Sequence, residues 1–325
     1  MRKILALAVL LCQTAIPIIG NSQTDNTKTT VTPLELKFDT NWKKKENSPA
    51  TKQEKQVTSK PITLKKPTAA DTITMMARKF FISAGKKAKE NDYQGAINDY
   101  SKSLGFNKSA ITLTKRAYAY LLINKYDSAI SDSKEAMKMI PKNFEACSIM
   151  GIAYYEKKEY EEALATFRKA NQLNPKNPDP AIFNYMAAIK FLQRDYKTAL
   201  LYYDTVVGRD STFQDVYTNR GMMHHYLGNY SDAIDNYTKA LALDSTNSNA
   251  YNNRGGAELL IKDYTAAVKD LDKAISLNPK YSNAYENRGK AKKELGDLAG
   301  ACADWTTALT LGSGSSKELI IKYCK

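Results

Sequence analysis

The sequence predicts an all-α protein in which pairs of helices repeat along the chain and form a solenoid. The first observation is a phrase that recurs every 34 positions, at Tyr217, Tyr251 and Tyr285, because internal periods of this size are typical of solenoids. The second is that apolar and small residues recur at three- and four-residue steps, as in amphipathic helices. The third is the composition of the 325 residues, 43% apolar and 25% charged with 10 prolines, which excludes disorder throughout.

Residues 1–22 have the pattern of a secretory signal peptide. Met1, Arg2 and Lys3 make a basic start, an apolar run extends from Ile4 to Leu11, and small residues follow as far as Ser22, where we expect cleavage. No later stretch approaches the roughly 18 to 20 apolar residues that a membrane-spanning helix needs, so we expect no transmembrane span in the mature chain. The sequence therefore predicts an exported protein, periplasmic or secreted, with a bacterial source favoured.

Residues 23–76 are rich in Thr, Lys, Asn and Ser, and their sparse apolar residues show no period. This composition predicts a disordered basic linker, although the run from Pro33 to Phe38 could instead dock as a short strand or on a partner. The whole chain has a formal net charge of +14, which loss of Arg2 and Lys3 with the signal peptide would lower by two, to +12. Anionic membranes, polyanions and acidic proteins therefore all enter as partner classes.

A second phrase, an aromatic or large apolar residue followed three positions later by alanine, marks seven units. The period slips by two residues where Pro178 and Asp179 are inserted. The predicted units are residues 77–109, 110–143, 144–177, 180–213, 214–247, 248–281 and 282–315, and a capping helix is predicted at 316–325.

The third unit shows which known repeat these phrases resemble. It has Cys147 in a bulky position, with Gly151, Tyr154, Ala163 and Phe167 following. These residues and their spacing resemble the tetratricopeptide repeat (TPR) family, and the resemblance covers about residues 77–315. It implies a right-handed superhelix, an inner groove that binds other proteins, and no cofactor.

Small residues on the two helices of a unit are expected to allow close contact. Gly221, for example, should meet Ala233, with Gly151, Gly255 and Gly289 in equivalent pairs. Three arginines each precede a packed glycine, and acids lie on the second helices, so we expect ion pairs inside the stack rather than a row that binds anions. The expected pairs join Arg220, Arg254 and Arg288 to Asp235, Asp270 and Asp304.

The face of the first helices opposite the packed side is the candidate binding surface, since the TPR resemblance implies that it lines the inner groove. In the last three units this face carries amides, which both donate and accept hydrogen bonds and can pair with a peptide backbone of any sequence. The alternative is that these amides pack one helix against its neighbour. The amides are Asn219, Asn253, Asn287, Asn249 and Asn283.

The same face is more apolar in the middle units, and Tyr226 follows on the fifth. An exposed apolar surface of this kind favours contact with a partner's side chains or helix. Alternatively the superhelix closes there on itself or on the N-terminal linker. The residues concerned are Ile149, Ile152, Tyr185 and Leu192.

Reactive side chains are scarce. The 2 histidines are adjacent, at His224 and His225, and we expect the first in the core and the second towards solvent or the groove. No phosphate-binding loop, nucleophile elbow or metal-ligand spacing is present in the sequence, which predicts no catalytic site, no metal and no cofactor. Cys302 and Cys324 could form a disulfide in an exported protein; the alternative is two unpaired thiols.

Taken together, these features favour a non-enzymatic scaffold or chaperone-like adaptor of the secretory or envelope compartment, which holds a peptide segment of another protein. The alternative is an electrostatic binder of anionic polymer or membrane surface, which uses the lysine-rich linker and the basic stack. Nucleic acid is not favoured, because basic and aromatic residues are not interleaved in one patch. Self-association, with the linker of one chain in the groove of another, is a third hypothesis.

Overall fold

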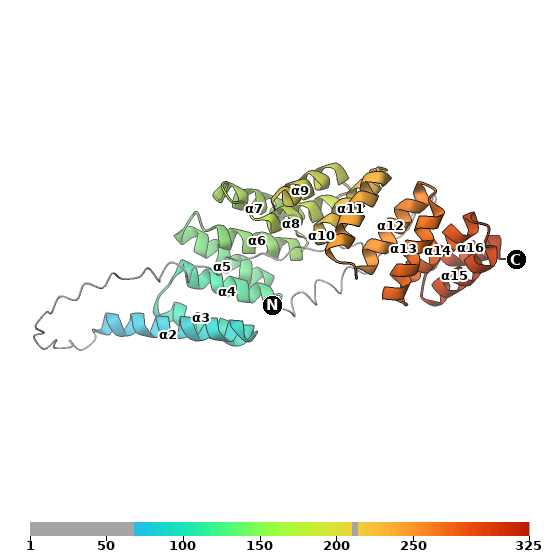
Figure 1. Cartoon of the computed structure of the whole chain (residues 1–325). Coiled ribbons are helices and arrows are strands. Elements are labelled where there is room, and N and C mark those ends of the chain that lie inside the picture. The colour runs from blue at the N-terminus through green and yellow to red at the C-terminus, as the bar shows by residue number, and fades with distance from the viewer. Residues whose placement is uncertain (1–67, 210–213, 325) are drawn as a thin grey trace, which may run out of the picture. The chain divides into compact units, whose positions relative to one another are not determined.

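A computed structural model describes residues 68–209 and 214–324, and within these ranges the chain forms fifteen helices and no strand (Figure 1). This confirms the all-α fold of paired helices. The expected signal peptide and residues 23–67 of the expected linker lie outside the described residues. The described residues fall into two compact units, and the division in the chain lies between Ile182 and Phe183: residues 68–182 are called the N-terminal unit here, and residues 183–324 the C-terminal unit.

The helices follow one another in antiparallel pairs joined by short turns. The N-terminal unit contains α2 (Ala69–Lys89), α3 (Tyr93–Phe106), α4 (Ala110–Leu122), α5 (Tyr126–Met139), α6 (Phe144–Glu156) and α7 (Tyr160–Leu173). Helix α8 (Pro180–Leu192) contains the division between the units. The C-terminal unit continues with α9 (Tyr196–Arg209), α10 (Gln214–Tyr226), α11 (Tyr230–Leu243), α12 (Ser248–Leu260), α13 (Tyr264–Leu277), α14 (Ser282–Glu294), α15 (Leu298–Thr310) and α16 (Ser315–Tyr323).

Helix α2 begins at Ala69, upstream of the expected boundary at residue 77, so the last part of the expected linker is helical. The reason is a capping box. The Thr68 side chain accepts a hydrogen bond from the Asp71 backbone nitrogen at 3.2 Å, and the Asp71 carboxylate accepts one from the Thr68 backbone nitrogen at 2.9 Å. This arrangement satisfies two of the donors that a helix start leaves free. The threonine-rich composition that predicted disorder therefore also contains the start signal.

The turn between the helices of a pair requires a left-handed backbone conformation. In the fifth and seventh pairs a glycine provides it, with φ of 80° at Gly228 and 89° at Gly296, which costs glycine little. The second helix then begins within two residues, and in the seventh pair the Asp297 side chain accepts a hydrogen bond from the Gly300 backbone nitrogen at 2.8 Å.

Contact between the helices of a pair centres on a small residue and a ring. A Cβ placed on Gly221 would lie 2.6 Å from the Tyr237 ring, and one on Gly289 would lie 2.5 Å from Trp305 Nε1. The expected partners, Ala233 and its equivalents, are fully buried, but an aromatic ring approaches these glycines first. In the sixth pair the ring is replaced by Leu271.

Arginine side chains link the sixth and seventh pairs to the pairs that precede them. Arg288 makes two hydrogen bonds to Asp304 of its own pair, at 2.9 and 2.6 Å, and a third to Asp272 of the preceding pair at 2.6 Å. Arg254 does the same with Asp270 and Thr238. A bidentate bond of this type fixes orientation as well as charge. These side chains therefore hold the second helices of neighbouring pairs together.

The expected pair of Arg220 with Asp235 is wrong. Arg220 Nε instead lies 2.8 Å from Asp204 Oδ1 of the preceding pair. The position that corresponds to Asp270 and Asp304 is held here by Asn236, sixteen residues after the arginine, as in the spacing of the other two contacts. Asp235 is one residue short of that spacing and faces away.

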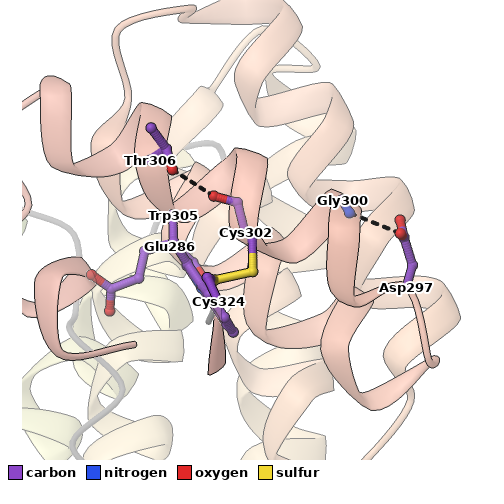
Figure 2. The surroundings of a disulfide bond; sticks show 7 residues. All are labelled: Glu286, Asp297, Gly300, Cys302, Trp305, Thr306 and Cys324. Carbon is purple, nitrogen blue, oxygen red and sulfur yellow. Dashed lines mark hydrogen bonds between the residues drawn. A yellow bond between two sulfur atoms is a disulfide. The ribbon is translucent and has the colours of Figure 1, made fainter. Parts of the chain in front are cut away.

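Helix α16 covers the last pair and is attached at both of its ends. At its start, the buried Glu286 carboxylate accepts hydrogen bonds from Ser315 at 2.5 Å and Ser316 at 3.1 Å, as well as from Ser313. At its end, a disulfide joins Cys324 to Cys302 of α15, with the two Cα atoms 5.7 Å apart (Figure 2). The structure therefore brings together the two cysteines that the sequence singled out.

Candidate functional site

Helices α10, α12 and α14 of the C-terminal unit carry the asparagines of the candidate surface. Asn249 and Asn253 are one turn apart on α12, as are Asn283 and Asn287 on α14, so each pair shares one face of its helix. The start of α12 is fixed by Asn247, whose side chain accepts a hydrogen bond from the Ala250 backbone nitrogen at 3.0 Å. We call Asn219, Asn249, Asn253, Asn283 and Asn287 the amide surface.

Hydrogen bonds join the deeper amides across helices. Asn287 Nδ2 on α14 donates to Asn252 Oδ1 on α12 at 3.2 Å, and Asn252 Nδ2 donates to Asn253 Oδ1 at 3.3 Å. Asn252 is a residue that the sequence analysis missed, although its position directly before Asn253 was a signal. Asn253 uses its oxygen and Asn287 its nitrogen in this chain, so each keeps one amide atom for another partner. The amides therefore do pack neighbouring helices together, as the alternative interpretation expected.

The amide surface has a buried floor and an accessible rim. Asn219, Asn253 and Asn287 are 3%, 6% and 3% exposed, whereas Asn249 and Asn283 are intermediate. The Asn219 side-chain nitrogen is buried and has no hydrogen-bond partner among the described residues. A buried donor without a partner is rare in native proteins, so this nitrogen marks a place where a ligand acceptor or a water would be stabilised.

An acid lies beside this floor. Asp215, on the first turn of α10, is exposed, yet desolvation by the surrounding protein and then the nearby Asp244 raise the pKa of its carboxyl. Asp215 has no cation beside it among the described residues, so this end favours a donor-rich partner over an acidic one.

Aromatic residues adjoin the amide surface at the end of α10. Tyr226 stacks on Tyr196 with ring centroids 4.7 Å apart, and Phe191 lies 5.6 Å from Tyr226. His225 contacts Tyr230 edge to face at 5.5 Å. His225 is 9% exposed, and desolvation lowers its pKa to about 4. The expectation that this histidine faces solvent or the groove is therefore wrong, because the rings of the turn cover it.

The apolar residues expected in the middle of the surface are mostly buried. Ile149 and Ile152 are 0% and 6% exposed and Tyr185 is 8% exposed, while Leu192 is 43% exposed. The reason is visible in α6 and α8, which are apolar on nearly every side, and such helices belong in a core. Ile149, Ile152 and Tyr185 thus contribute packing, and only Leu192 is an exposed apolar contact.

Nothing in the described ranges suggests a metal centre or a membrane span. Between 68 and 209 and between 214 and 324, no three His, Cys, Asp or Glu side chains are grouped as metal ligands. None of the helices in the same ranges is both long and apolar enough to cross a bilayer.

Comparison with protein-family models matches three segments of the chain to tetratricopeptide repeats, at residues 144–177, 215–247 and 257–296. The first two segments coincide with the pairs α6–α7 and α10–α11, and the third begins near the end of α12 and covers α13 and α14. The chain is a tetratricopeptide repeat protein. Proteins of this family generally mediate protein–protein interactions.

Similar curated proteins match about a third of the chain. The chain is 37% identical over 95 residues to small glutamine-rich tetratricopeptide repeat-containing protein 2 of Mycosarcoma maydis, which covers 29% of this chain and 27% of that protein. It is 31% identical over 107 residues to the human protein SGT1 homolog, covering 33% and 29%. The chain thus spans less than a third of the length of these relatives.

Solved structures share the fold of this TPR protein. A TPR protein of Cytophaga hutchinsonii has a TM-score of 0.61 with 19% identity, covering 73% of this chain and 98% of that one. YrrB, described as a TPR protein with an unusual peptide-binding site, has a TM-score of 0.51 with 22% identity, covering 57% and 95%. At these identities the likeness shows the fold alone.

Glu258 is a second residue of this TPR protein that the sequence analysis missed. It lies on α12, is 9% exposed, and has one carboxylate oxygen with no partner among the described residues. Desolvation and then the charge of Asp270 raise the pKa of Glu258 to about 7, although Arg254 opposes this. The corresponding residues in two other units are Tyr154 and His224, so the clue was an acid in a position that holds a ring in those two units.

Stability should therefore depend on Glu258 between about pH 4.5 and about pH 7. The folded protein holds the proton more tightly than the unfolded chain, so the free energy of unfolding falls as pH rises through this window. Glu258→Gln is expected to flatten that fall and to stabilise the protein by about 1–3 kcal/mol at about pH 8. Urea denaturation at about pH 5 and about pH 8 measures both effects.

The matched control is Glu162→Gln, which changes an exposed glutamate on α7 and should leave the pH profile unchanged. If Glu258→Gln has the same free energy of unfolding as the wild type at both pH values, Glu258 is ionised throughout.

Proposed function

We propose that this TPR protein is a non-enzymatic interaction scaffold or chaperone-like adaptor, and that it holds an extended segment of a partner protein on the amide surface. The observation that carries the proposal is the buried Asn219 side-chain nitrogen without a partner among the described residues. The spare amide atoms of Asn253 and Asn287 support it, because they follow Asn219 at the same repeat spacing. Amides in such a row pair with peptide groups independently of the partner's sequence.

The peptide-binding site of YrrB supports this proposal by analogy only, since that protein is similar to this chain in fold. We further propose that the protein works in the secretory or envelope compartment of a bacterium. The basic and apolar pattern of residues 1–22 supports export. The disulfide between Cys302 and Cys324 supports an oxidising environment.

Photocrosslinking in cells tests the location of the partner. A photoreactive amino acid is introduced at Asn249 or Asn283 on the accessible rim of the amide surface. Matched controls carry it at Lys239 on α11 or Lys269 on α13, which are exposed positions on second helices. We expect adducts from the two rim positions and none from the controls. Equal adducts from all four positions would contradict a partner on the amide surface.

Removal of the amides tests the chemistry. The triple variant Asn219→Ala, Asn253→Ala and Asn287→Ala is expected to weaken capture of the crosslinked partner about tenfold or more, since each lost hydrogen bond contributes about 0.5–1.5 kcal/mol. The control replaces three exposed asparagines of the N-terminal unit, Asn98, Asn107 and Asn177. Circular dichroism checks that the triple variant remains folded, because the bond between Asn287 and Asn252 is lost. Unchanged capture by a folded triple variant would defeat the role of the amides.

Salt separates this function from electrostatic binding. Contacts made by neutral amides should weaken little between about 50 mM and about 200 mM salt, whereas binding of a polyanion falls steeply over that range. If binding falls steeply with salt in both the wild type and the triple variant, the lysine-rich residues are favoured as the binding element.

A further inference from the structure

The N-terminal unit has an exposed apolar surface. On α2, Met75 is 64% exposed and Ile82 is 60% exposed, and on α4 Ile111 is 59% exposed. Single exposed apolar residues need no explanation, but Met75 and Ile82 are two turns apart on one side of α2, about 10 Å along its axis. This side is opposite to Ala77 and Ala84, which are buried.

Ile82 and Ile111 hold positions equivalent to those of two residues that contact each other in the next pairs. In the next two pairs, Lys115 Nζ on α4 lies 2.7 Å from Glu145 Oε1 on α6. Ile82 occupies the position in the first pair that Lys115 occupies in the second, and Ile111 corresponds likewise to Glu145. Where the second and third pairs carry an ion pair at these positions, the first two pairs carry two exposed isoleucines at the equivalent positions.

Unpaired cations frame this apolar strip. Helix α2 carries five basic residues and only one acid, Asp71, which is engaged with Thr68. Arg78 lies one turn before Ile82, and Lys86 and Lys89 lie one and two turns after it. These three are exposed and have no ion pair within residues 68–209 and 214–324. Lys115 is the exception, because Glu145 neutralises it.

We propose that this α2–α4 surface, formed by Met75, Arg78, Ile82, Lys89 and Ile111, binds an acidic amphipathic helix of a partner protein. Apolar side chains of that helix cover the two isoleucines, and its carboxylates pair with Arg78 and Lys89. A neutral apolar segment leaves the cations unpaired, and a polyanion leaves Ile82 and Ile111 exposed, so neither uses the whole surface. The inference rests on the scaffold function proposed above but not on the amide surface, which lies in the other unit.

The test uses the full chain and three fluorescent peptides of about 20 residues, long enough to form a helix. The first has leucines at helical spacing with glutamates elsewhere. The second replaces its leucines with serine, and the third replaces its glutamates with lysine. Fluorescence anisotropy at about 150 mM salt is expected to give binding of the first peptide about tenfold or more tighter than of either control. Equal binding of the serine peptide would overturn the proposal, because charge alone would then suffice.

Variants then locate the site. The double change Ile82→Asp with Ile111→Asp is expected to weaken binding of the first peptide about tenfold or more. The matched control is Ile321→Asp on α16, which alters an isoleucine with the same 59% exposure as Ile111. Arg78→Glu with Lys89→Glu should reverse the preference towards the lysine peptide, while Lys142→Glu with Lys176→Glu, at exposed positions of the same unit, should not. Unchanged binding in folded Ile82 and Ile111 variants overturns the proposal.

Two further arms separate the alternatives. The first arm measures binding to vesicles of phosphatidylglycerol. If the vesicles bind through Ile82 and Ile111 and the first peptide does not bind, the surface is a lipid site and the proposal is overturned. The Asn219, Asn253 and Asn287 triple variant should bind the first peptide as tightly as wild type. If that triple variant alone lost the peptide, the amide surface would be its site, which overturns this inference and leaves the proposed scaffold function standing.

Discussion

Replacing Cys302 and Cys324 with serine is expected to destabilise the C-terminal end of the stack by about 3 kcal/mol. The two cysteines are separated by 22 residues, and closing a loop of that size lowers the entropy of the unfolded chain by an amount equivalent to roughly 3 kcal/mol. Because each pair of a repeat protein contacts only its neighbours, the loss should be confined to α16 and α15. Hydrogen exchange followed by mass spectrometry measures it segment by segment.

Exchange should therefore rise in residues 298–324 of the double variant and remain unchanged in α2–α7. Reduced wild-type protein is the matched control and should give the same pattern. Helix α16 should not detach completely, since Glu286 still binds Ser315 and Ser316. Complete labelling of both cysteines in the denatured, unreduced wild-type protein would show that the bridge is absent.

Gly289→Ala is expected to cost about 1–3 kcal/mol, the usual range for overpacking a filled core. The added Cβ would lie 2.5 Å from Trp305 Nε1 and 3.0 Å from the Ala301 carbonyl oxygen. Trp305 is fully buried and donates its ring hydrogen bond to the Glu286 carbonyl at 3.2 Å, so the ring cannot move without losing that bond. Urea denaturation followed by tryptophan fluorescence measures the change.

The control for this effect is Gly105→Ala, which changes a helical glycine of α3 with nothing within 4 Å of the new Cβ. Alanine is a better helix former than glycine, so this variant should stabilise α3 by about 0.5–1 kcal/mol. Opposite signs for the two variants would separate the steric effect from helix propensity. Equal and small effects would show that Trp305 is free to shift.

The architecture could be predicted from the sequence because the same pattern of contact residues recurs in several units. The 34-residue period and the turn glycines, Gly228 and Gly296, can be recognised from the sequence alone. The start of α2 was missed because residues 69–76 have the composition of a linker, and only the cap at Thr68 reveals the helix. Local capping thus outweighed composition at that boundary.

The candidate surface was harder to predict because periodicity gives the face of a residue but not its depth. The asparagines were assigned to the correct helices, yet their hydrogen bonds to Asn252 depend on the distance between α12 and α14. Ile149 was expected to be exposed and is buried, because a helix that is apolar on all sides has no recognisable outer face. The burial of His225 depends on rings from other helices, which no local pattern encodes.

The arginine contacts have a consequence for how such a chain can gain or lose length. Arg288 binds Asp272, and the residue one repeat earlier, Thr238, binds Arg254 in the same way. A deletion of residues 248–281 would place Arg288 against Thr238, a partner that an equivalent arginine already accepts. We therefore expect insertions and deletions of one whole period to be tolerated in evolution, because they leave each arginine with a partner in its own pair and another in the preceding pair.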